Sequence, residues 1–331
     1  MKTTLLNALK LLVTVVLFAV LLSSVNLNRL GEVLVRVRPL PLLLALALYF
    51  LAILIGAIKW QVLVRAQGIQ AALGSLLSFA LVGLFFGNVM PSNVGGDVIR
   101  AYDLARSTRG RAEAAAISVL VDRLLGLAAF LCMAVVMAVV ASVFLARGSE
   151  IEELEIATAL AAAALVGGFA LLFSRRVSRR AAFLFERGPL ARLNPIAQKV
   201  YHALQVYRFR YAALATNMLL SLTIVVITAF VWYTVGLAVG IEDVPFLVFL
   251  LFNPLIAFVL LIPISLNGLG AKEVAVVFFF GLIGVSQEQA LSMSLLFHVI
   301  IIATSLPGGL LWLRARNLLP EAAENSRAGL D

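Results

Sequence analysis

Long apolar runs recur along the chain, and they leave it very few folds. Most are close to the roughly 20 residues that a helix needs to cross the hydrocarbon core of a bilayer. The run 112–145 is too long for one simple span, so its first turns should project from the membrane. Charged residues make up 13% of the 331 residues, against about a quarter in soluble domains. We therefore predict an all-α polytopic membrane protein, with one integral membrane domain over residues 1–313. The predicted full spans, about six, are residues 5–25, 40–59, 112–145, 156–173, 212–239 and 286–313.

Two further apolar runs, 73–89 and 246–262, each lead into a stretch broken by proline and glycine. Such backbone is tolerated at membrane depth only where protein or a water-filled cavity covers it. We therefore predict that segments 73–97 and 246–283 enter the membrane and return, as two re-entrant hairpins. The residues that form the breaks are Pro91, Gly95 and Gly96 in the first hairpin and Pro263, Gly268 and Gly270 in the second.

Loop charges predict the topology. Positive residues favour the cytoplasm, so the basic loop 174–210, the N-terminus and the polar tail 314–331 are placed there, with an interfacial helix in the basic loop. The acidic loops 147–155 and 242–243 are placed outside a prokaryotic plasma membrane. The two hairpins then enter from opposite faces. This arrangement is compatible with an inverted repeat that has its site at the repeat interface.

Charged residues follow both breaks directly, and charge inside a membrane is costly enough to mark a candidate site. Asp97 and Arg100 follow the first break, while Lys272 and Glu273 follow the second. Each pair also has a purely structural interpretation. Asp97 could be a helix N-cap, although a helix N-terminus also suits a phosphate group. Lys272 and Glu273 could form a structural ion pair.

Asp122 and Arg123 lie together inside a predicted span. They could pair with each other, or Arg123 could reach the membrane interface. Alternatively, Arg123 could face a cavity and hold a phosphate through two hydrogen bonds. His298 in the last span is either a packing residue or a ligand, and His202 is far away in the basic loop, which argues against a metal site. Cys132 is the only cysteine, so no disulfide framework is expected.

The net charge of +9 does not indicate a nucleic-acid partner, because the positive residues lie in short loops beside the spans. The sequence has no Walker-type glycine-rich loop and no Gly-x-Ser-x-Gly elbow, which argues against an ATP motor and a serine hydrolase. Nothing in it predicts a cofactor.

Four stretches, taken in order, resemble the signatures of one known family. They are Pro91-x-x-x-Gly95-Gly96-Asp97-x-x-Arg100, Arg123-Leu-Leu-Gly-Leu127, Asn267-Gly-Leu-Gly-Ala-Lys-Glu273 and Leu306-Pro-Gly-Gly309. On these residues the chain is similar, over nearly its whole length, to the lysylphosphatidylglycerol synthase transmembrane-region family, also called flippase-like. It departs from the family pattern at Lys272 and His298, where arginine is expected, and both changes weaken bidentate phosphate binding.

The resemblance implies a protein that binds a phospholipid or lipid-linked molecule and moves it between leaflets without ATP. Arg100, Arg123 and Lys272 would hold an anionic headgroup. Asp97 and Glu273 would orient those cations or meet a basic headgroup. The aminoacyl transferase part found in the best-known member is absent here, so lysylphosphatidylglycerol synthesis is not implied.

Two other functions stay open. One is an enzyme, or an accessory of an enzyme, in glycosyl or aminoacyl transfer onto lipid carriers. The other is a scaffold that binds a partner through loop 174–210. A homo-oligomer is compatible with each of these readings.

Overall fold

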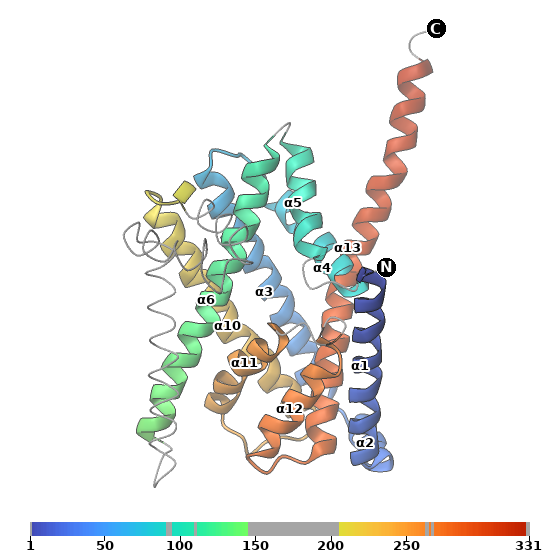
Figure 1. Cartoon of the computed structure of the whole chain (residues 1–331), viewed down its shortest axis with the longest axis vertical. Helices are drawn as coiled ribbons and strands as arrows, with labels where there is room; N and C mark the ends of the chain where they lie inside the picture. Colours follow the sequence, from blue (N-terminus) through green and yellow to red (C-terminus); the bar gives the residue numbers. More distant parts are fainter. Residues whose placement is uncertain are drawn as a thin grey trace.

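The computed structural model describes residues 2–90, 95–108, 111–144, 205–261, 265 and 268–328, and every regular element within these ranges is a helix. The prediction of an all-α polytopic membrane protein is confirmed (Figure 1). The helices are α1 (Lys2–Ser24), α2 (Leu27–Val35), α3 (Pro39–Ala66), α4 (Leu73–Val89), α5 (Gly95–Ser107), α6 (Ala112–Phe144), α10 (Tyr211–Ala238), α11 (Phe246–Leu261), α12 (Ala271–Gly281) and α13 (Gln287–Ala328).

Four of these helices, α3, α6, α10 and α13, are long and apolar enough to cross a membrane. The bent pair α1 and α2, with 89° between the two helices, makes a fifth candidate span. The predicted span 156–173 lies outside the described residues, as does most of the basic loop 174–210. The helix α13 continues to Ala328, through most of the predicted polar tail.

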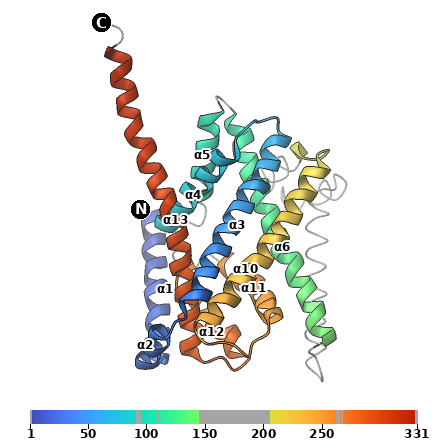
Figure 2. The same ribbon diagram turned by 180° about the vertical axis from the view of Figure 1, so that it is seen from behind.

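The two hairpins open at opposite ends of the bundle. Arg111 donates a hydrogen bond to the Gly68 carbonyl at 3.0 Å, so the link into α6 lies beside the link from α3 to α4. The other end of α3 lies beside the end of α10, because the Arg38 amide donates to the Ala238 carbonyl at 3.0 Å. The helices α11 and α12 therefore open at the end opposite to α4 and α5, as Figures 1 and 2 show. This matches the arrangement that the loop charges predict.

Glycines bring α4 into close contact with both α5 and α13. A Cβ atom added at Gly83 of α4 would lie 2.7 Å from the Gly96 carbonyl oxygen of α5, closer than real Cβ contacts allow. A Cβ atom added at Gly308 of α13 would overlap the Leu81 carbonyl oxygen of α4. The short helix α4 is thus held by α5 and by the last helix of the chain.

The predicted break residues fall at the hairpin tips where the structure describes them. Gly95 is the first residue of α5. Gly268 and Gly270 precede α12 with φ angles of 75° and 82°, in the left-handed region that favours glycine. Pro91 and Pro263 lie outside the described residues.

Candidate functional site

Five charged side chains from three helices meet at the tip of the first hairpin. Asp122 pairs with Lys59 Nζ at 2.8 Å and with Arg100 Nη1 at 3.2 Å. Asp97 pairs with Arg100 Nη2 at 3.0 Å and also with Arg123. We call these five residues the charge network. Its three cations and two acids leave a formal excess of one positive charge.

Helix packing fixes the inner part of the charge network. Lys59 comes from α3 and Asp122 from α6, while Asn217 of α10 joins them. The Asn217 side-chain amide donates to Asp122 Oδ1 and to the Lys59 carbonyl, both at 3.0 Å. The Arg100 guanidinium lies over the Trp60 ring, 5.2 Å from its centroid. Because these contacts join different helices, the inner part of the charge network depends on the assembled bundle.

Exposure rises across the charge network from one side to the other. The side chains of Lys59 and Asp122 are only 10% and 5% exposed, whereas that of Arg123 is 34% exposed. A buried charge is tolerated when it is paired and hydrogen-bonded, which describes the inner side. The outer side opens into a groove of about 510 Å³, which we call the charged groove. Arg123 and Asp97 are the most exposed members of the charge network that line it.

The structure corrects two structural interpretations of these residues. Asp97 is not the N-cap of α5, because the helix begins two residues earlier at Gly95 and the Asp97 carboxylate pairs with two arginines. Asp122 and Arg123 do not pair with each other. Asp122 binds Lys59 and Arg100, whereas Arg123 binds Asp97.

Sequence reasoning missed Lys59 and Asn217. The apolar pattern predicts a span that ends at Lys59, although α3 continues to Ala66. The residues after Lys59 are largely apolar up to Arg65, which was the available signal that the lysine lies within the helix. No comparable signal marks Asn217, whose partners are 95 and 158 residues away along the chain.

The second hairpin tip has its own buried charges. Glu273 is fully buried and accepts hydrogen bonds from the Gly270 amide at 2.7 Å and the Ser294 hydroxyl at 3.2 Å. Lys272 Nζ lies 3.3 Å from Glu273 Oε1 and 3.5 Å from His298 Nδ1. The ion pair between Lys272 and Glu273, one of the two interpretations left open by the sequence, is therefore present. Lys272 and His298 line a cavity of about 230 Å³.

The two predicted halves of the site share a boundary. Asn88, near the end of α4, and Phe130 of α6 line both the charged groove and the cavity beside Lys272. The structure thus brings the residues predicted at the first break together in one cluster, and places those at the second break across this shared wall.

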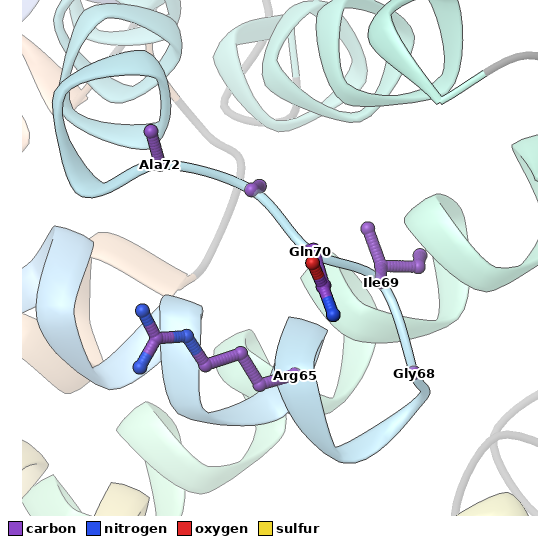
Figure 3. Close-up of a pocket in the computed structure, with 6 residues that line it drawn as sticks. Arg65, Gly68, Ile69, Gln70 and Ala72 are labelled. Carbon is purple, nitrogen blue, oxygen red and sulfur yellow. The ribbon is translucent and has the colours of Figure 1, made fainter.

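A further pocket lies away from the charged residues of the two hairpin tips. The link between α3 and α4 forms a pocket of about 530 Å³, and Arg65 is the charged residue among the described residues that line it (Figure 3). Among the residues that the structure describes, no group of histidine, cysteine and acidic side chains could hold a metal ion.

Comparison with known proteins identifies relatives over most of the chain. The family described as "Lysylphosphatidylglycerol synthase TM region" matches residues 7–308. A UPF0104 membrane protein of Methanothermobacter thermautotrophicus is 28% identical over 130 residues, and one of Methanocaldococcus jannaschii is 29% identical over 126 residues. These stretches cover 39% and 38% of the chain, and 38% of each relative's length. A UPF0104 membrane protein of Pyrococcus horikoshii is 23% identical over 331 aligned residues, covering 94% of the chain and 98% of the relative.

Proposed function

The chain belongs to the lysylphosphatidylglycerol synthase TM region family, and on that premise we propose that it binds a phospholipid or lipid-linked molecule and moves its headgroup between the leaflets of a prokaryotic plasma membrane. In this proposal the α4–α5 end and both termini face the cytoplasm. A headgroup enters the charged groove from that side.

The observation that carries the proposal is the charge network beside a groove within the bundle. A phosphate group crossing hydrocarbon loses its hydration, and this loss is costly unless protein groups replace the water. The excess positive charge and the partly exposed Arg123 supply such groups. An arginine guanidinium can hold a phosphate through two parallel hydrogen bonds.

The network also supplies a way to release the headgroup. The Asp97 carboxylate forms ion pairs with Arg123 and Arg100 in the structure. An arriving phosphate group therefore competes with this carboxylate for the same guanidinium donors. A bound headgroup therefore replaces existing ion pairs, which keeps net binding weak enough for transport. Lys272 lies beyond the wall formed by Asn88 and Phe130, and would receive the headgroup next.

Replacing Arg123 with glutamine should slow lipid translocation at least roughly tenfold, since a charge-assisted contact of about 1.5–3 kcal/mol is lost. Arg123→Lys should recover only part of the rate, because lysine keeps the charge but not the forked donor geometry. The measurement is the rate at which dithionite gains access to fluorescent phosphatidylglycerol in liposomes containing the purified protein.

Arg314→Gln is the matched control, since Arg314 is exposed on α13 and does not line the charged groove. It should translocate lipid at the wild-type rate. A wild-type protein that neither moves nor binds any tested lipid would refute the proposal. If the leaflet distribution in cells is unchanged while a lipid product is missing, the accessory-enzyme alternative is favoured.

A further inference from the structure

A second groove, of about 750 Å³, lies on another side of the first hairpin. Its walls come from α4, α5 and α13, and we call it the α5–α13 groove. Among the described residues, none lines both this groove and the charged groove. Trp312 of α13 packs edge-to-face on Phe86 of α4 with 5.3 Å between the ring centroids, and both rings line the groove. The groove is therefore a separate feature that the proposed translocation does not use.

Two opposite charges line this groove one helical turn apart. Asp103 and Arg106 both project from α5, yet no ion pair within 4.0 Å joins them in the described part of the chain. Burial raises the pKa of the Asp103 carboxyl, and the nearby Arg106 opposes this by lowering it. Asp103 is thus partly removed from water, while Arg106 is exposed. An acid and a base that line one groove without pairing within 4.0 Å suit a ligand that carries both charges.

Apolar side chains border the groove and lead away from it. On α5, Val98 and Tyr102 are 61% and 63% exposed. On α13, Leu310 and Leu313 are 64% and 50% exposed. Such surface is stable on a membrane protein when lipid covers it. Tyr102 and Trp312, which both line the groove, are residue types that favour the level of the lipid headgroups.

We propose that the α5–α13 groove binds a phospholipid whose headgroup carries both a phosphate and a primary amine. Arg106 meets the phosphate, Asp103 meets the ammonium, and the acyl chains lie along the exposed apolar face of α13. The charge complementarity decides between lipid classes. A purely anionic headgroup would satisfy Arg106 but would place negative charge near Asp103.

The test compares lipids that differ in the amine. The full chain is purified in detergent, titrated with phosphatidylethanolamine or phosphatidylglycerol, and analysed by native mass spectrometry. The wild type should prefer phosphatidylethanolamine. Asp103→Asn should remove this preference by lowering phosphatidylethanolamine affinity roughly tenfold, the change expected for one charge-assisted hydrogen bond. Asp103→Glu should keep it, and Arg106→Gln should weaken the binding of both lipids.

A photoreactive acyl chain on phosphatidylethanolamine locates the site. Cross-links should fall on α13 and α5, and Asp103→Asn should reduce them. Glu113→Gln and Arg36→Gln are the matched controls, because both residues are exposed and neither lines the groove. Equal binding of the two lipids by the wild type, or unchanged cross-linking in Asp103→Asn, would overturn the proposal.

This result is distinguishable from failure of the proposed translocation. Arg123→Gln alters the charged groove and leaves the α5–α13 groove intact, so it should retain the phosphatidylethanolamine preference while losing transport. Asp103→Asn should lose the phosphatidylethanolamine preference in the binding assay, whether or not the protein moves lipid.

Discussion

Replacing Asp122 with alanine should lower the free energy of unfolding by about 3–5 kcal/mol, the usual effect of breaking a buried ion pair. Lys59 and Arg100 both pair with Asp122, and the Asp122 side chain is only 5% exposed. Without the carboxylate, the buried Lys59 ammonium has lost its nearest counter-charge, and Asn217 has lost an acceptor. The measurement is unfolding of the purified protein by sodium dodecyl sulfate, followed by circular dichroism.

The double variant Lys59→Met, Asp122→Leu distinguishes the cost of an unpaired buried charge from the cost of lost side-chain packing. Removing both charges should cost less than Asp122→Ala alone, because no lysine is left uncompensated. Arg100 still has Asp97 as a partner in this double variant. If Asp122→Ala unfolds at the wild-type detergent concentration, the charge network contributes nothing to stability and this account of it is wrong.

Replacing Gly308 with alanine should destabilise the protein by about 3 kcal/mol, at the upper end of the usual cost of overpacking. The added Cβ atom would overlap the Leu81 carbonyl, which is backbone and cannot move aside as a side chain can. The helices α4 and α13 would have to separate. The same detergent titration measures the loss, and cysteine cross-linking between α4 and α13 reports the separation.

Gly56→Ala is the control: it is also a glycine-to-alanine change within a helix, but it should raise the stability of the protein. A Cβ atom at Gly56 of α3 meets nothing within 4 Å. Since alanine is favoured over glycine inside a helix, this variant should be about 0.5–1 kcal/mol more stable. Equal effects of the two substitutions would mean that close contact between α4 and α13 is unimportant.

Much of the fold could be predicted because membranes impose strong rules. Apolar length predicts the spans, and loop charge predicts that segments 73–97 and 246–283 return to the side from which they came. Asp97, Arg100 and Arg123 could be chosen because polar groups beside a broken helix in a membrane need a reason to be there. These rules depend on local sequence, so one chain is enough to apply them.

The rest depends on which helix faces meet, and local sequence does not specify that. Lys59 and Asn217 lie within otherwise apolar helices and acquire partners only when α3, α6 and α10 pack together. Helix packing also decides why Asp122 and Arg123 pair with other residues and not with each other. Adjacent residues on a helix point in different directions, so each meets a different neighbour. Asp97 was open to interpretation as a cap because helix boundaries are uncertain by one or two residues.

The contact between Leu81 and Gly308 also bears on how the protein is made. The helix α4 leaves the ribosome early. The helix α13, which packs against α4 through Gly308, is the last of the described helices to be synthesised. During that interval the side of α4 that later receives Gly308 has only lipid, or a temporary partner, against it. A nascent chain stopped before Gln287 would already contain every residue of the charge network, yet it would lack α13, one of the two helices that hold α4 in place.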